Sequence, residues 1–351
     1  MTRRTALACL ALLFLPALAL ADAVAGGSPS IWLPAQVSQA GHDIDALYMN
    51  VMVMVAVIFV ATEGLLLYSI IAFRAKPGRR AQYFHGSTGV ELILAAVPAL
   101  ILLYITVTSS QLWDRVRLAP PKGADVVHIQ VYSEQFAWNF RYPGPDAAFG
   151  TKDDIMVSVD AAVPVGKDIV FHLSSKDVIH SFFLPESRVK QDLVPGLLGK
   201  VWTRWDLIPV WDLAAQKRVL LTLDQYRAAA VATSGYTLQS EPNPVKRWFQ
   251  ASDSAKINYL HYHYERDNDA KLVVEKGGKP CKDAPQYVLH YYEIGCAQLC
   301  GNLHFAMRGT MKVLPPEDYE AWLKAQQPDS SLADKWNGIW DKYHPEFNKI
   351  L

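Results

Sequence analysis

The sequence has no surplus of charge of either sign, and charged residues of any kind are scarce. Its 351 residues include 34 basic and 34 acidic side chains, which gives a formal net charge of zero with 19% charged residues. Soluble domains carry about 25% charged residues, so the chain is more hydrophobic than a typical soluble protein. The missing basic excess argues against nucleic-acid binding, and the 51% hydrophobic content argues against disorder. The length predicts about two domains.

A long apolar run near the N-terminus has the pattern of a secretory signal. Arg3 and Arg4 precede the apolar stretch from Ala6 to Leu20, and Ala19-Leu20-Ala21 supplies an A-x-A cleavage site. We therefore expect residues 1–21 to be a signal peptide, with an uncleaved membrane anchor as the alternative. Export predicts a periplasmic or extracellular C-terminal part.

Two further apolar segments, at about 47–73 and 90–110, are each long enough to cross a membrane, because a spanning helix needs about 20 residues. The loop between them has no acidic residue and carries Arg74, Lys76, Arg79 and Arg80. Basic loops stay in the cytoplasm, so residues 22–115 are expected to hold a transmembrane helix hairpin whose flanks both lie outside. Buried helices of a soluble protein are the alternative, which the charge asymmetry disfavours.

Two carboxylates accompany these spans. Glu63 lies in the middle of the first span, where an unpaired charge is costly, so we expect it to face a protein neighbour or to stay protonated. Glu91 lies at the cytoplasmic start of the second span. A solvated helix-end residue and a functional carboxylate both fit that position.

Residues 120–316 have a different pattern from the apolar segments, with short runs of β-branched or aromatic residues separated by proline and glycine. The runs are Val126–Val131, Ile155–Val159, Asp168–Leu173, Val201–Leu207 and Tyr287–Ile294. This pattern predicts an antiparallel sandwich or barrel. Residues 208–284 have a different texture, with a helix-like stretch at Trp211–Val231, and are interpreted as an insertion between two strands. Residues 317–351 form a C-terminal tail.

The strongest local signal is a cluster of potential metal ligands, Cys296, Cys300, His304 and Met307. A disulfide between the two cysteines would close too short a loop to constrain much chain entropy, so metal binding is the better interpretation. The spacing places all four on one face of a helix, whereas the flanking glycines favour a loop. By contrast, His261 and His263 alternate with tyrosines like one face of a strand, and Cys281 is expected to be an ordinary unpaired thiol.

The ligand types bear on which metal is bound. Two cysteines and two histidines are typical of zinc, but a thioether is not a usual zinc ligand, and thiolate, imidazole and thioether together suit copper. Two cysteines fit two copper ions bridged by two thiolates, which requires a second histidine. His180 follows a predicted strand in an apolar frame; alone it fits a core residue, and beside this cluster it fits a ligand.

These motifs together resemble subunit II of the haem–copper cytochrome c oxidases. The resemblance rests on the two spans, the strand-rich domain, the C-x3-C-G-x2-H-x2-M loop and the upstream H-S-F-x-x-P segment. It implies a two-helix transmembrane hairpin carrying a periplasmic, all-β cupredoxin-like Greek-key barrel, here with a long inserted segment, in a bacterial inner membrane. It also implies a dinuclear CuA centre bridged by Cys296 and Cys300, with His180 and Met307 completing one copper and His304 and the carbonyl of Gln298 the other.

The same resemblance implies a function and partners. In this family the copper centre accepts electrons from a c-type cytochrome and passes them to haem in subunit I, where oxygen reduction is coupled to proton pumping. Lys190 and Asp192 lie in a K-x-D-x-x-P-G-like segment that implies an interface with subunit I, and Glu91 resembles a residue at a proton-uptake entry. Catalytic activity then requires subunit I and the other oxidase subunits.

Several positions depart from the family pattern. Gln298 stands in place of a glutamate that also binds magnesium at the subunit I interface, which puts that magnesium in doubt. Gln135-Phe136-Ala137-Trp138 replaces Q-W-x-W, so Phe136 and Trp138 are the expected electron-entry residues, and Arg141 stands where the family has an acid. These changes favour a different donor docking, such as a membrane-bound or tethered cytochrome. A nitric oxide reductase subunit with the same copper domain, and a copper-free subunit II of a quinol oxidase, are the alternatives.

Overall fold

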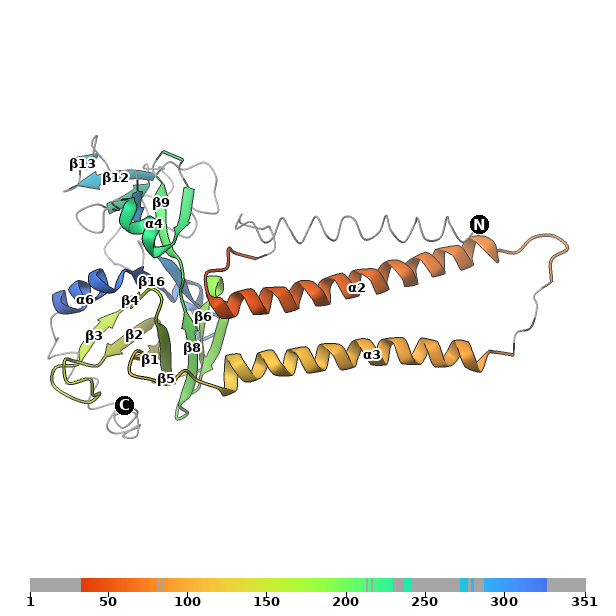
Figure 1. Cartoon of the computed structure of the whole chain (residues 1–351), viewed down its shortest axis with the longest axis horizontal. Helices are drawn as coiled ribbons and strands as arrows, with labels where there is room; N and C mark the ends of the chain where they lie inside the picture. The colour runs from red at the N-terminus through yellow and green to blue at the C-terminus, as the bar shows by residue number, and fades with distance from the viewer. Residues whose placement is uncertain are drawn as a thin grey trace. The chain divides into compact units, whose positions relative to one another are not determined.

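The computed structural model describes residues 33–80, 83, 85–212, 214–215, 217–229, 231, 237–240, 272–276, 279–280 and 287–326. The expected signal peptide, His261, His263, Cys281 and the tail beyond residue 326 lie outside these residues. The chain divides into two compact units (Figure 1). One contains residues 42–119, and the other contains residues 36–41 together with the chain from Pro120 onward.

The first unit contains two long apolar helices. Helix α2 spans Gln39–Ala72, and helix α3 spans Thr88–Trp113 before one π-helical turn, η1, at Asp114–Leu118. Both are long and apolar enough to cross a membrane, and none of the residues in their most apolar windows is buried. Their hydroxyl side chains donate to the helix backbone one turn earlier, as Thr62 Oγ1 does to the carbonyl of Ile58 at 2.9 Å. These hydroxyl groups, which lipid cannot satisfy, are thus bonded internally.

The second unit is built on two five-stranded sheets. The first has the order β3 (Ile155–Ser158), β2 (Ala137–Tyr142), β1 (Val127–Glu134), β5 (Asp168–Ser175) and β8 (Gly199–Arg204). The second has the order β4 (Asp160–Pro164), β16 (Arg308–Leu314), β15 (Tyr292–Cys296), β6 (His180–Leu184) and β7 (Val189–Leu193). A short 3-10 turn, η2 (Pro185–Ser187), connects β6 and β7.

The predicted strand-rich sandwich or barrel is confirmed, but two of its strand pairs are parallel and not antiparallel as expected. Strand β1 pairs with β5 in parallel, and β4 pairs with β16 in parallel. Parallel neighbours cannot be joined by a tight hairpin, so the chain must leave the sheet and return. Between β1 and β5 it forms β2, β3 and then β4, which belongs to the other sheet. This crossing between sheets is what gives the domain its cupredoxin-like topology.

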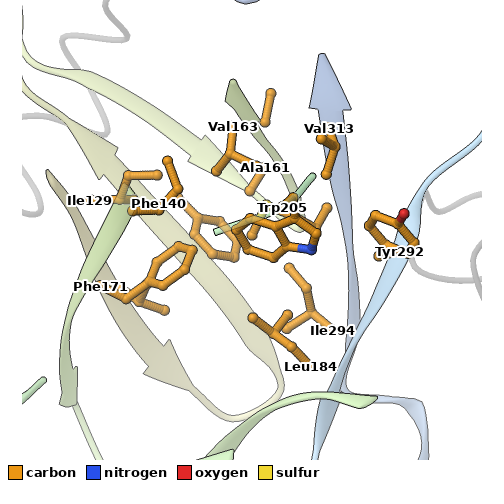
Figure 2. Close-up of a cluster of buried hydrophobic side chains, with 14 of the residues drawn as sticks. Ile129, Phe140, Ala161, Val163, Phe171, Leu184, Trp205, Tyr292, Ile294 and Val313 are labelled. Atoms are coloured by element: carbon orange, nitrogen blue, oxygen red, sulfur yellow. The ribbon is translucent and has the colours of Figure 1, made fainter. Parts of the chain in front are cut away.

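The hydrophobic core lies between the two sheets. Phe140 and Phe171 come from the first sheet and Tyr292 and Val313 from the second, with Trp205 among them (Figure 2). Phe171 meets Trp205 edge-on, with ring centroids 6.2 Å apart. Aromatic side chains bury large apolar areas, so these rings supply much of the free energy that holds the sheets together.

The predicted helix-like stretch at Trp211–Val231 is mostly wrong. Strands β9 (Ile208–Asp212) and β10 (Lys217–Leu221) form an antiparallel hairpin, and only α4 (Leu223–Ala228) is helical, with a capping box at Thr222. Strand β14 (Tyr287–Leu289) pairs with β9 as the third strand of this sheet. The residues of β9 are all buried, and a continuous apolar run cannot by itself distinguish a buried strand from a helix.

The remaining elements are small. Strands β11 (Thr237–Ser240), β12 (Leu272–Lys276) and β13 (Lys279–Pro280) form a separate antiparallel sheet. Helix α6 (Pro316–Ala325) follows β16 and packs Trp322 against Tyr142, with ring centroids 5.5 Å apart. Residues 36–41 are bound to the sandwich through Ser38, whose hydroxyl donates to the carbonyl of Ser187 at 3.0 Å.

Candidate metal centre

The centre lies where strands β6 and β15 pair. His180 is the first residue of β6 and Cys296 is the last residue of β15, and the register sets Cys296 opposite Phe182. Beyond Cys296 the chain forms a loop with a 3-10 turn, η4, at His304–Ala306, and β16 begins at Arg308. The segment that carries four of the predicted ligands is therefore a loop, and the single helical face is excluded.

This arrangement brings all six predicted ligands together. Cys300 Sγ lies 3.8 Å from Cys296 Sγ, 3.6 Å from His304 Nδ1 and 3.7 Å from Met307 Sδ. His180 Nδ1 lies 3.1 Å from Met307 Sδ and 3.9 Å from Cys296 Sγ. Cys296 Sγ also lies 3.2 Å from the carbonyl oxygen of Gln298. Within the described ranges, His180, Cys296 and Cys300 are the one group of three histidine, cysteine or acidic side chains close enough to share a metal ion.

The ligands are closed off from solvent on the side of the core. His180 and Met307 are fully buried, and Cys300 is 4% exposed. Trp138, also fully buried, packs edge-on to His180 with ring centroids 6.3 Å apart. A rigid and water-poor environment restricts how far the ligands can move when the charge of a bound metal changes.

A carboxylate orients the first histidine. Asp177 Oδ1 lies 2.9 Å from His180 Nε2, which leaves Nδ1 facing the sulfur atoms. Metal-binding histidines commonly use the second ring nitrogen in this way, and the contact fixes both the tautomer and the ring orientation. Asp177 is not among the residues predicted from the sequence, although a carboxylate three residues before a candidate ligand is a usable signal.

The two thiols differ in their acidity. Burial raises the pKa of Cys296, but hydrogen bonding with His180 and with backbone groups outweighs it and brings the pKa below its ordinary value. Burial, together with the negative charge of Cys296, raises the pKa of Cys300. The chain without metal therefore holds one thiolate beside one thiol.

This difference predicts selective alkylation of the metal-free chain. At pH 7, iodoacetamide should modify Cys296 at least about tenfold faster than Cys300, because the thiolate is the reactive form and one pKa unit changes its fraction about tenfold. The rate at Cys296 should fall as the pH is lowered through its depressed pKa. Peptide mapping by mass spectrometry resolves the two sites. Equal rates at both sites would contradict the assignment.

The other predicted residues lie in several places. Phe136 is half-buried and packs against the ligand loop, whereas Trp138 is buried behind His180 and presents no surface to a donor. Lys190 and Asp192 are exposed on β7, and Lys190 Nζ lies 4.7 Å from the centre of the Phe183 ring. In the other unit, Glu91 is exposed in the first turn of α3 and Glu63 is exposed in α2.

The position of Arg141 contradicts the expectation that this residue affects donor docking. Its side chain is fully buried and forms an ion pair with Asp154, so it cannot touch a docking cytochrome. The replacement of the family's acid at this position therefore belongs to the packing of the sandwich.

Comparison with known proteins identifies the family of the chain. Two helices that can anchor it in a membrane, followed by a sandwich with a thiol, imidazole and thioether cluster, define a membrane-anchored cupredoxin-like protein. The model of the cytochrome c oxidase subunit II transmembrane domain matches residues 28–112, and that of the subunit II periplasmic domain matches residues 129–211. The chain belongs to the cytochrome c oxidase subunit II family. It is an inner-membrane protein with a periplasmic C-terminal domain.

Individual relatives are distant. Cytochrome c oxidase subunit 2 of Alkalihalophilus pseudofirmus is 28% identical over 48% of this chain and 48% of its own length. The alternative cytochrome c oxidase subunit 2 of Bradyrhizobium diazoefficiens is 27% identical over 42% of this chain and 60% of its own. The chain thus spans about half the length of these curated relatives. The periplasmic domain of subunit II of Bradyrhizobium japonicum cytochrome oxidase aligns in structure with 15% identity and a TM-score of 0.32, covering 59% of this chain and 96% of that one.

The matched segments do not reach the whole centre. The periplasmic-domain match ends at residue 211, so His180 lies inside it and the loop from Cys296 to Met307 lies beyond it. The family-model matches therefore do not cover the complete ligand set, which rests on the geometry of this chain.

Proposed function

We propose that the chain is the electron-entry subunit of a terminal respiratory oxidase. In this proposal a c-type cytochrome delivers electrons to a dinuclear copper centre, and haem in subunit I receives them for oxygen reduction coupled to proton pumping. The observation that carries the proposal is the convergence of two thiols, two imidazoles, a thioether and a backbone carbonyl. Family membership supports it independently.

The donor set fits two copper ions better than one zinc ion. A tetrahedral zinc site would use two cysteines and two histidines and would leave the sulfur of Met307 and the carbonyl of Gln298 idle. Yet Met307 Sδ lies 3.1 Å from the His180 ring nitrogen, and the Gln298 carbonyl oxygen lies 3.2 Å from Cys296 Sγ. Soft sulfur ligands together with imidazole favour copper. A dinuclear copper centre held by these six ligands would take up and release one electron at a time.

The residues of the chain supply the conditions for that exchange. Cys296 and Cys300 present two sulfur atoms close enough to bridge the same pair of metal ions. Asp177 holds the imidazole of His180 in one orientation, and burial of His180 and Met307 keeps water away. Gln298 is exposed and uncharged, so we do not extend the proposal to magnesium.

An exposed apolar surface adjoins the centre, and we call it the apolar rim. Among the described residues of the second unit, the exposed large apolar side chains all lie on three loops: Val178, Ile179, Leu197, Leu198, Leu299, Leu303 and Phe305. A bridge between Ser175 and Pro195 holds two of these loops together. Nearby charges are paired internally, as in Lys176 with Glu134 and Arg308 with Glu293, each at 2.5 Å. An apolar patch of this kind marks a surface that contacts other proteins, and it supports docking by a redox partner.

Replacing Phe136 with tryptophan should change donor docking alone. Phe136 packs against the ligand loop at Gly301 without supplying a ligand atom, so the copper spectrum of Phe136→Trp should match that of the parent chain. The rate of reduction by an external cytochrome c should change, which stopped-flow absorption measures. Loss of copper in this variant would show that the residue has been misplaced.

The partner of the chain tests the proposed function. Purification of the intact complex, followed by mass spectrometry of the large subunit and a spectrum of its haem, should identify an oxygen-reducing haem–copper subunit I. A nitric oxide reductase subunit would overturn the oxidase assignment. A quinol oxidase complex without copper would overturn electron entry through this chain.

A further inference from the structure

We propose that Gln135 is a positioning residue for the metal centre, because it connects the loop that carries Cys300 to the loop that carries Asp177 and leads into His180. Gln135 follows strand β1 in the turn before β2, and it supplies no ligand atom of its own. The significance of this role for electron transfer rests on the proposed function. The hydrogen bonds that support the role join residues of this chain and need no bound metal.

The first bond joins Gln135 to the ligand loop. Its side-chain nitrogen Nε2 donates to the backbone carbonyl of Cys300 at 2.5 Å, across 165 residues of sequence. Cys300 Sγ has the other three sulfur and nitrogen ligands of the loop within 3.8 Å. A hydrogen bond to the backbone of this residue therefore fixes the central ligand of the cluster.

The second bond joins the same residue to the loop that leads into His180. The backbone N–H of Gln135 donates to Asp177 Oδ2 at 2.7 Å. The other oxygen of Asp177 contacts His180 Nε2 and also accepts the N–H of Val178 at 2.7 Å. A continuous series of hydrogen bonds thus runs from His180 through Asp177 and Gln135 to Cys300.

The ligand loop has a glycine where Gln135 and Phe136 approach it. A Cβ atom placed on Gly301 would lie 2.9 Å from Gln135 Nε2 and 2.9 Å from Phe136 Cζ, and the glycine has φ of +137°. Any side chain at this position would displace the amide from the Cys300 carbonyl. The close approach therefore depends on glycine for both space and backbone conformation.

The physical consequence is a centre whose ligands are held in place before metal binds. The loop residues Ala297, Gln298 and Leu299 are exposed, so core packing does little to restrain them. The N–H of Ala297 bonds to the carbonyl of Ser181 at the start of the loop, and the hydrogen bond from Gln135 adds a restraint further along, at Cys300. Supporting contacts of this kind set the geometry and properties of a metal site. Without Gln135 the loop should sample other conformations.

Hydrogen exchange of the full-length, metal-free chain in detergent tests this role. In Gln135→Leu, amide exchange in the segment 297–307 should accelerate about fivefold, the change expected from losing one net hydrogen bond. Gln135→Lys keeps an N–H donor of similar reach and should restore slow exchange. Gln326→Leu is the matched control, because Gln326 also donates its side-chain amide to a backbone carbonyl, that of Trp322 at 3.4 Å, in helix α6.

A second measurement follows copper loading of the same variants. Gln135→Leu should shift the reduction potential and the copper hyperfine splitting, and Gln326→Leu should shift neither. Unchanged exchange at 297–307 in Gln135→Leu would overturn the proposal, as would equal acceleration throughout the β-sandwich, which would indicate general destabilisation. If exchange responds as expected and no variant or parent chain binds copper, the positioning role stands and the proposed function fails.

Discussion

Replacing Cys300 with serine should abolish the metal centre and lower electron transfer from cytochrome c at least about 100-fold. Loss of a supporting residue near a metal commonly costs 10- to 100-fold, so loss of a direct ligand should cost at least as much. Cys300 Sγ lies within 3.8 Å of Cys296 Sγ, His304 Nδ1 and Met307 Sδ. A serine hydroxyl is a hard ligand that copper binds poorly and that cannot replace a bridging thiolate.

The consequence can be measured in the intact complex. Copper analysis and paramagnetic resonance should show loss of the dinuclear signal in Cys300→Ser, while the haem of subunit I remains. Cys281→Ser is the matched control, because Cys281 is not among the proposed ligands, and its spectrum should be unchanged. A full dinuclear signal in Cys300→Ser would rule out Cys300 as a bridging ligand.

Replacing Arg141 with leucine should lower the free energy of unfolding of the periplasmic unit by about 3–5 kcal/mol, because it leaves a buried carboxylate without its positively charged partner. Arg141 and Asp154 have side-chain exposures of 0% and 1%. Arg141 Nε donates to Asp154 Oδ2 at 2.6 Å and its Nη1 donates to Gln130 Oε1 at 3.2 Å. The ion pair thus holds the loop before β3 against the first sheet.

The pH dependence of this loss has a definite sign. Burial raises the pKa of Asp154 above its ordinary value even though the charge of Arg141 lowers it. In Arg141→Leu the lowering effect of the guanidinium is lost, and only the hydrogen bonds from Gly150 and Thr151 still oppose burial. The pKa of Asp154 in the folded state therefore rises further, and the folded state binds the proton more tightly than the unfolded chain does. Stability is then gained below the unfolded pKa of about 4 and lost as the pH rises through the folded value. The deficit should therefore be larger at pH 7 than at pH 4.

Denaturant unfolding followed by tryptophan fluorescence at both pH values measures this deficit. The double variant Arg141→Leu with Asp154→Leu is the control, since it removes both charges together. It should recover part of the stability at pH 7 and lose the pH dependence. A deficit in Arg141→Leu that does not change between the two pH values would show that the carboxylate is not the source.

The proposed ligands could be predicted from the sequence because few residue types bind metals, and these residues are of those types. Cysteine, histidine and methionine in one short segment are rare enough to indicate copper, and His180 then completes the set. Asp177 and Gln135 could not be found in the same way. Their roles depend on which loops meet across the sheet, and Gln135 acts partly through its backbone N–H, which every residue except proline has.

In the fold, likewise, some features can be predicted from hydrophobic patterning, whereas others depend on how distant strands pair. The apolar helices and the strand-rich domain follow directly from hydrophobic patterning. The parallel pairs β1–β5 and β4–β16 do not, because strand direction depends on where the chain crosses between sheets. Val219, Leu220 and Leu221 form a short apolar run that suits a helix or a strand, and pairing with β9 decides for the strand. Burial of Arg141 likewise depends on Asp154, which the surrounding loop brings beside it.

The most direct test of the central claim is metal analysis and paramagnetic resonance of the purified full-length chain after copper loading. We predict two copper ions per chain and, in the oxidised form, one unpaired electron shared equally by both. A chain that binds a single copper ion, or that takes up zinc with Met307 unaffected, would contradict the claim.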